Sequence, residues 1–222
     1  MNPKKLAAEA AAELVQDGMV VGLGTGSTAY WAIQRLGHRV KAGLQMKAIA
    51  TSSSSEDLAR QLEIPIVPFS EIDHIDIAID GADEVDSELS LVKGGGGALL
   101  REKIVAAASR IFYVVVDESK LVPQLGAFPL PVEVVPFGAD MTKRKIEELG
   151  CRASIRMQMG ERYITDNGNY ILDCDFGAIR NPERLHAQFH AIPGVVENGL
   201  FINMANRVFV GYQDGSVRRM ER

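Results

Sequence analysis

The sequence is poor in cysteine. Its 222 residues include only Cys151 and Cys174. They form no C-x-x-C motif, and two thiols in a chain of this length make no disulfide framework. A reducing compartment is the simplest interpretation, so we expect a cytoplasmic protein.

A surplus of positive charge and a long apolar run are also missing. The chain has 24 Lys+Arg against 29 Asp+Glu, a formal net charge of −5. A general binder of nucleic acid or of a membrane surface carries a basic excess, so we expect neither partner. The most apolar stretch, 104–116, contains Arg110 and is shorter than the roughly 18 residues of a membrane span. The N-terminus has no apolar segment typical of a secretory signal.

What is present is a hydrophobic content of 46%, enough for a folded core. Up to about residue 129, short apolar runs alternate with segments of helical periodicity. Strands are predicted at 19–22, 47–50, 75–79 and 111–116, and helices at 27–40, 53–62 and 97–109. This alternation predicts a Rossmann-like, mostly parallel α/β sheet with helices on both faces.

After residue 130 the order of elements becomes β-α-β-β-α-β. The stretches 162–165 and 170–173 flank an Asp-Asn-Gly-Asn turn, which predicts a hairpin. Such an order is typical of a small α+β domain of ferredoxin-like type. We therefore expect a catalytic domain formed by 1–129 and 206–222, and a small domain formed by 130–205.

The first candidate site is Gly22-Leu-Gly-Thr-Gly-Ser-Thr28, between a predicted strand and a predicted helix. Ligands of open α/β sheets bind at the carboxyl ends of strands, where helix N-termini offer N–H groups to phosphate. The spacing fits neither the dinucleotide fingerprint nor a P-loop. An anion site is favoured over a purely structural turn.

The second is Asp80-Gly-Ala-Asp-Glu-Val-Asp86, directly after the strand at 75–79. Four carboxylates in seven residues repel one another, which favours a role in catalysis or binding. The calcium-loop pattern fails, because Ala82 and Val85 stand where a ligand and a glycine belong. Asp80 and Asp83 are the candidates.

The third is Lys93-Gly-Gly-Gly-Gly-Ala-Leu-Leu-Arg-Glu-Lys103. Four consecutive glycines are costly in conformational entropy and make sense where the backbone passes against a ligand. Taken alone, Arg101–Lys103 also fits an ordinary charged helix face.

Weaker signals are single residues. His186 and His190 have a spacing that binds metals, but no third ligand is apparent, and a surface helix is favoured. Lys120 and Lys4 are possible phosphate partners.

Together, the three segments resemble the type A ribose-5-phosphate isomerase family. Further stretches that carry the resemblance are Asp117–Lys120, Phe128–Glu133, Thr165–Asn169 and Ile192–Val196. The segments occur in the family's order over nearly the whole chain.

The resemblance implies interconversion of D-ribose 5-phosphate and D-ribulose 5-phosphate, in the non-oxidative pentose phosphate pathway, without metal or other cofactor. It implies Glu102 as the base and a homodimer or homotetramer. The substrate-binding positions that it implies are Thr25, Gly26, Ser27, Thr28, Asp80, Gly81, Ala82, Asp83, Lys93, Gly94, Gly95, Gly96 and Lys120, with Lys4 as a further candidate.

The chemistry fits these residues. A single carboxylate is able to move a proton between C2 and C1 of an enediolate. Lys93 and the N–H groups of the glycine run are suited to the oxyanion, and Asp80 and Asp83 to opening the sugar ring. Two alternatives stay open: a sugar-phosphate sensor, and another enzyme of the same fold, such as an amino-sugar-phosphate deaminase or a coenzyme A transferase.

Overall fold

A computed structural model of the protein describes residues 2–221. The chain divides into two compact units. The large unit consists of residues 2–82, Arg101–Leu121 and 203–221; the small unit consists of Asp83–Leu100 and Val122–Ile202.

The large unit contains a six-stranded sheet in the order β15-β14-β6-β3-β1-β2. Neighbouring strands from β2 to β14 run parallel, and β15 alone is antiparallel to its neighbour. The predicted parallel sheet is confirmed. Its strands are β1 (Val20–Leu23), β2 (Lys47–Ala50), β3 (Ile75–Asp80), β6 (Ser109–Asp117), β14 (Arg207–Gly211) and β15 (Val217–Glu221).

Two helices of this unit begin where the sequence provides side-chain caps. The Asn2 side chain accepts from the N–H groups of Lys4 and Lys5, and Ser52 accepts from Ser55. The helices are α1 (Pro3–Ala12), α2 (Ala29–Lys41), α3 (Ser53–Gln61) and α4 (Leu99–Ala107), whose first two residues belong to the small unit, with short 3-10 turns η1 (Phe69–Glu71) and η2 (Glu118–Lys120). No helix in the described residues is long and apolar enough to cross a membrane.

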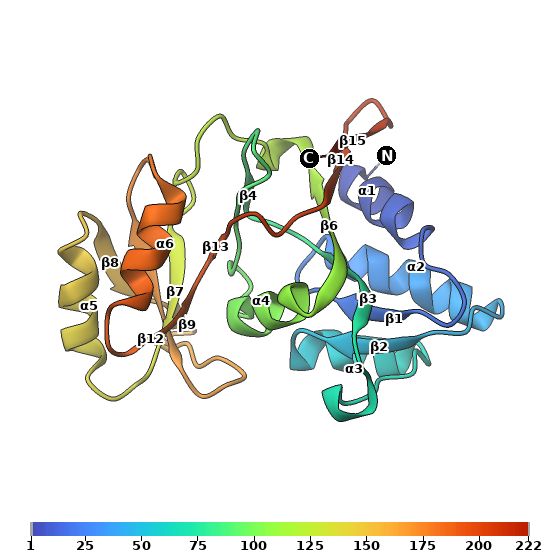
Figure 1. Ribbon diagram of the computed structural model, residues 1–222, viewed down its shortest axis with the longest axis horizontal. Helices are drawn as coiled ribbons and strands as arrows, with labels where there is room; N and C mark the ends of the chain where they lie inside the picture. The colour runs from blue at the N-terminus through green and yellow to red at the C-terminus, as the bar shows by residue number, and fades with distance from the viewer. Residues whose placement is uncertain (1, 222) are drawn as a thin grey trace. The chain divides into compact units, whose positions relative to one another are not determined.

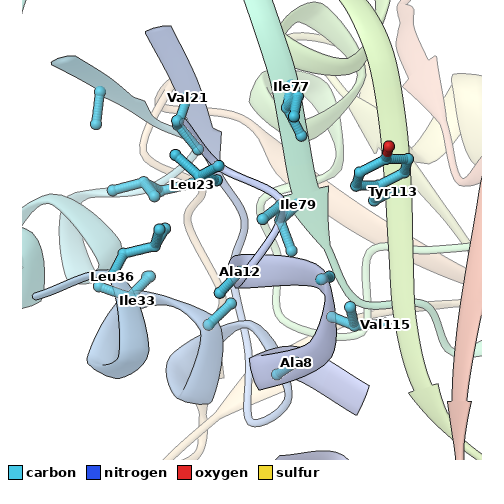
Figure 2. Packing of buried hydrophobic residues seen from close by; sticks show 14 of the residues in the cluster. Ala8, Ala12, Val21, Leu23, Ile33, Leu36, Ile77, Ile79, Tyr113 and Val115 are labelled. Carbon is cyan, nitrogen blue, oxygen red and sulfur yellow. The ribbon is translucent and has the colours of Figure 1, made fainter. Parts of the chain in front are cut away.

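Helices cover both faces of the large sheet. Figure 2 shows alternate strand residues such as Leu23 and Ile79 packed near Ala8 and Ala12 of α1 and near α2. On the other face α4 packs so closely that a Cβ atom at Gly22 would touch Val105. Each fully buried aliphatic side chain contributes about 1.5–3 kcal/mol. The core therefore fixes the strand ends that carry the site.

The small unit has the predicted β-α-β-β-α-β order. Its antiparallel sheet is β12-β7-β11-β8, the ferredoxin-like arrangement. The elements are β7 (Leu130–Val134), α5 (Ala139–Glu147), β8 (Arg152–Ile155), β11 (Tyr170–Asp175), α6 (Pro182–His190) and β12 (Val195–Asn198), drawn in Figure 1. Leu130, Val132 and Val134 pack with residues of α5 and α6 in one core.

The predicted hairpin around the Asp-Asn-Gly-Asn turn is wrong. Residues 165–169 do form a turn, in which the Thr165 N–H donates to Asn169. However, the strand before it, β10 (Glu161–Arg162), pairs with β9 (Met157–Gln158), while β11 pairs with β7 and β8. The buried Glu133 carboxylate holds the turn, because its Oε1 accepts from the side chains of Thr165, Asn167 and Asn169.

A third, small sheet joins β4 (Glu84–Val85), β5 (Leu91–Val92) and β13 (Leu200–Phe201). It groups residues 83–100 with the small unit, whereas the sequence-based boundaries place them in 1–129. The difference arises because β5 pairs with β13, which directly follows the small unit's β12.

Candidate functional site

The carboxyl ends of three adjacent strands carry most of the candidates in the large unit. Gly24 follows β1, Asp80 ends β3, and Lys120 closes the 3-10 turn after β6. From β1 the chain continues to β2 on one side and then crosses to β3 on the other side, so the strand order reverses at β1. Such a switch point is where open α/β sheets bind ligands.

Asp80 anchors the first glycine-rich loop, which is formed by residues 22–28. Its side chain is buried, and Oδ1 accepts from the N–H of Thr25 at 3.0 Å and from the N–H of Gly81 at 2.7 Å. The Gly24 N–H donates to Ile79 at 2.9 Å, so the loop is also tied to β3 by its backbone. Asp80 thus combines a loop-holding contact with a position at the end of a strand.

A cluster of four hydroxyl side chains lies behind this loop, formed by Thr25, Thr51, Ser52 and Ser55. Thr25 Oγ1 lies 2.7 Å from Thr51 Oγ1 and 2.8 Å from Ser52 Oγ. The Ser55 hydroxyl donates to the carbonyl oxygen of Gly24 at 2.7 Å. The hydroxyl cluster therefore fixes the loop from the side of α3.

By itself, the serine run Ser52–Ser55 predicts only a cap for the helix that follows it. The available signal was position: this serine run directly follows β2, the strand beside β1 in the sheet. Hydroxyl-rich segments at neighbouring strand ends are able to share one network, as they do here.

A cation lies at the start of α2. The Lys4 ammonium group donates to Ser27 Oγ at 3.1 Å, so the N-terminal helix brings positive charge to the loop. Thr28 is the N-cap of α2 and makes no side-chain capping bond. First-turn N–H groups with a nearby lysine are suited to binding an anion.

Glu102 lies on α4 and is only 4% exposed, and the adjacent Lys103 is 9% exposed. An ordinary charged helix face is solvated, so that alternative does not describe these two residues. Burial of a carboxylate is expensive unless it is compensated or used, which favours a functional role for Glu102. The burial of Lys103 had no separate signal in the sequence.

The small unit carries Asp83, Lys93 and the glycine run at one end of the β4–β5 pair. The Asp83 N–H donates to Val92, and Asp83 Oδ2 accepts from the N–H of Gly95 at 2.8 Å. Lys93 is 2% exposed, and its Nζ lies 5.4 Å from the centre of the Phe201 ring. Asp83 therefore holds the second glycine-rich loop as Asp80 holds the first.

Arg156 also holds the second loop, a role that the sequence analysis did not predict. Its guanidinium donates to the carbonyl oxygens of Gly94 at 2.8 Å and Gly95 at 3.2 Å. Asp173 pairs with the same guanidinium, with Nε at 3.0 Å. An isolated arginine in a weakly patterned segment gives no sequence signal for such a role.

Comparisons with known proteins agree with these observations. The family described as Ribose 5-phosphate isomerase A (phosphoriboisomerase A) matches residues 47–215. The chain is 53% identical to the ribose-5-phosphate isomerase A of Bacillus mycoides over 97% of its length and 98% of the relative's. It is 54% identical to a Bacillus cereus protein of the same name, with the same coverage.

Solved structures are also similar over nearly the whole chain. A D-ribose-5-phosphate isomerase in complex with phospho-erythronic acid is 40% identical, with a TM-score of 0.95 and full coverage of both chains. The ribose 5-phosphate isomerase A of Methanocaldococcus jannaschii is 46% identical, with a TM-score of 0.93 over 99% of this chain and 98% of that one.

Proposed function

Since the chain belongs to the ribose 5-phosphate isomerase A family, we propose that Glu102 is the base with which it interconverts D-ribose 5-phosphate and D-ribulose 5-phosphate. The protein is an aldose–ketose isomerase of the pentose phosphate pathway. The observation that carries the assignment of Glu102 is its burial on α4, within the motif that the family resemblance rests on.

The phosphate group binds at the first glycine-rich loop. The N–H groups of Gly26, Ser27 and Thr28, which directly precede α2, provide donors, and Lys4, in contact with Ser27, supplies a positive charge. Lys120 is the second cation. Each hydrogen bond to the charged phosphate contributes roughly 1.5–3 kcal/mol. Thr25 has a positioning role, because its hydroxyl belongs to the hydroxyl cluster and its N–H is bound by Asp80.

The isomerisation itself is a proton transfer. Glu102 takes the proton from C2 of the open-chain aldose and returns it to C1, while the hydroxyl proton passes from O2 to O1, so the carboxylate ends the cycle in its starting state. The negative charge that develops on the enediolate oxygens is stabilised by the Lys93 ammonium group and by N–H groups of Gly94–Gly96. Donors held in place before the charge forms lower the barrier most.

Asp80 and Asp83 open the furanose ring. One accepts the proton of the C1 hydroxyl while the other, in its acid form, protonates the ring oxygen. Gly81 and Ala82, which join the two, line the same turn. The loop-holding contacts of both carboxylates support this role, since they fix each carboxyl group.

The test is Glu102→Gln, assayed by ketose formation from D-ribose 5-phosphate. We expect kcat to fall by at least ~10²–10⁴-fold, with binding of the sugar phosphate, measured by calorimetry, close to that of the parent protein. Near-normal turnover would remove Glu102 as the base. Saturable binding without turnover in the parent protein would instead favour a sensor.

Lys120→Ala is the paired variant. Because phosphate binding is shared by ground state and transition state, we expect mainly an increase of KM. An unchanged KM would assign the phosphate to other cations. The two variants together separate the reacting carboxylate from the binding residues.

Assembly and location belong to the same proposal. The small unit exposes large apolar side chains such as Phe137 and Met159, and contact with a second copy would remove such side chains from water. We expect a cytoplasmic protein that forms a homodimer or homotetramer. Analytical ultracentrifugation measures the number of subunits. A monomer at micromolar concentration would contradict it.

A further inference from the structure

Two histidines and a glutamate lie together on one surface of the small unit. His186 and His190 are one turn apart on α6, and the centres of their rings are 4.5 Å apart. Glu197, on β12, places Oε1 3.3 Å from His190 Nε2. One potential ligand atom of each residue lies within 4.8 Å of the others. The sequence indicated the two histidines but no third ligand, because Glu197 follows α6 on a separate element.

The local backbone directs Glu197 toward the histidines. The pairing of β12 with β7 shifts between Val195 and Glu197, where Val196 is an extra residue. A bulge of this kind re-aims the side chains that follow it. Asn198, which is fully buried, lies next to Glu197 and places its Oδ1 3.1 Å from Nδ1 of His186. Metal-ligating histidines usually hold one ring nitrogen in such a contact, which fixes the ring.

We propose that His186, His190 and Glu197 form a binding site for a divalent transition metal of the zinc type. Two imidazoles and a carboxylate, with water as the fourth ligand, are a common zinc donor set. Two ligands of tetrahedral zinc stand about 3.3–3.4 Å apart when their bonds are about 2.0–2.1 Å long. The distance of 3.3 Å between Nε2 of His190 and Oε1 of Glu197 already has this value. None of the three residues belongs to the proposed isomerase machinery.

Such a site has a structural consequence. It joins the middle and end of α6 to β12, which lies at the edge of the small unit's sheet. Metal bound to the folded state and not to the unfolded chain stabilises the fold. The site therefore acts on the stability of the small unit, while the isomerisation is expected to proceed without a metal.

The experiment is a titration of the full chain with ZnCl₂, followed by calorimetry, and with CoCl₂, followed by visible absorption. We expect one zinc ion per chain, a tetrahedral cobalt spectrum and a higher melting temperature with zinc. His190→Gln and Glu197→Gln should each weaken binding at least about tenfold. His38→Gln, which changes an exposed histidine on α2, is the matched control and should bind zinc as the parent protein does.

Two results would overturn the proposal. One is zinc binding that is unchanged in both His190→Gln and Glu197→Gln, since the metal would then lie elsewhere. The other is no stoichiometric binding by the parent protein, which would leave an ordinary His190–Glu197 ion pair. Turnover of ribose 5-phosphate is measured in parallel with and without EDTA. We expect it to be equal, so failure of the metal site is distinguishable from failure of the isomerase assignment.

Discussion

The two glycine-rich loops are held in the same way but stand against different surroundings. In the large unit, Asp80 accepts from the backbone of the first loop; in the small unit, Asp83 accepts from the backbone of the second. A Cβ atom at Gly24 would come within 2.6 Å of the Cα of Asp80, which is backbone. At Gly95 it would come within 2.6 Å of Asp83 Oδ1, the end of a side chain. The first loop is therefore built rigidly into the sheet, and the second has room to adjust.

This difference matters for the proposed roles. The phosphate group of the substrate does not change during the reaction, so a rigid loop is suited to binding it. The second loop carries the N–H donors to the enediolate oxygens, and the side chains of Asp83 and Arg156 hold these donors in place. Variants that perturb each loop separately test this difference in rigidity.

The largest effect is expected for Gly24→Ala. The methyl group has to displace Asp80 and the end of β3, so we expect a loss of stability of about 1–3 kcal/mol. We expect kcat/KM to fall by about 10²-fold or more, because small displacements of reacting groups are costly. Gly95→Ala is the comparison, and its loss of stability should be smaller, since only the side chain of Asp83 has to move. Equal losses of stability in the two variants, measured by urea unfolding, would contradict the difference in rigidity.

A smaller effect is expected for Arg156→Met. The change removes the donors to Gly94 and Gly95 and leaves Asp173 without its guanidinium partner. We expect kcat to fall about tenfold, with a smaller change in KM because the phosphate is held by the other loop.

Arg152→Met is the matched control for this variant. Arg152 begins β8, the strand that Arg156 directly follows, and pairs with Asp175 at 2.9 Å, but its side chain is 90% exposed. Exposed ion pairs contribute little, so we expect nearly parental kinetics. A similar loss of activity in both variants would indicate a general effect on the small unit.

The sequence predicted the first loop's setting better than the second's. A buried strand, a glycine-rich turn and a helix follow one another in the chain, so the position of Gly24 at a strand end was predictable from local pattern. The second loop depends on β4, β5 and β13, of two residues each. Strands this short show no periodicity. The pairing of β13 with β5 also joins residues that are far apart in the chain, such as Leu200 and Val92.

The side-chain contacts that hold loops and turns show the same contrast: those within one element are predictable from the sequence, and those between distant segments are not. The cap made by Ser52 was predictable because it acts within its own helix. The contact of Arg156 with Gly94, and the turn held by Glu133, join distant segments, and no local signal marks them. The wrong hairpin prediction had this cause, since a correct turn sequence does not specify which strands pair beside it.

For the first loop, Ser55→Ala removes the hydroxyl that donates to Gly24. We expect a loss of about 1 kcal/mol in stability, the usual value of one such bond, and a rise of KM of roughly twofold to fivefold from the displaced phosphate loop. Ser70→Ala, at an exposed position in η1, is the control and should leave KM unchanged. A Ser55→Thr variant that keeps the hydroxyl should restore most of the affinity; failure to do so would assign the effect to packing.

The smallest effect on activity is expected for Asp76→Asn, at the other end of β3 from Asp80. Asp76 Oδ2 accepts from the Val20 N–H at 2.8 Å, so it also joins β3 to β1, but at the end remote from the strand termini that carry the loops. Burial raises the pKa of Asp76, but the bonds from Val20 and His74 and the charges of His74 and Arg110 outweigh it and bring the pKa below 3.8.

A lowered pKa in the folded state means that the ionised carboxylate stabilises the fold above about pH 4 and that this contribution disappears as the pH falls through the folded-state value. We therefore expect Asp76→Asn to lose less than about 1 kcal/mol at pH 7, since the group is partly exposed, and to approach the parent protein's stability as the pH falls below 3.8. Its kcat and KM should match those of the parent at pH 7. A kinetic defect there would mean that the loops sense both ends of β3, and that the rigidity of the first loop belongs to the whole strand and not to its carboxyl end.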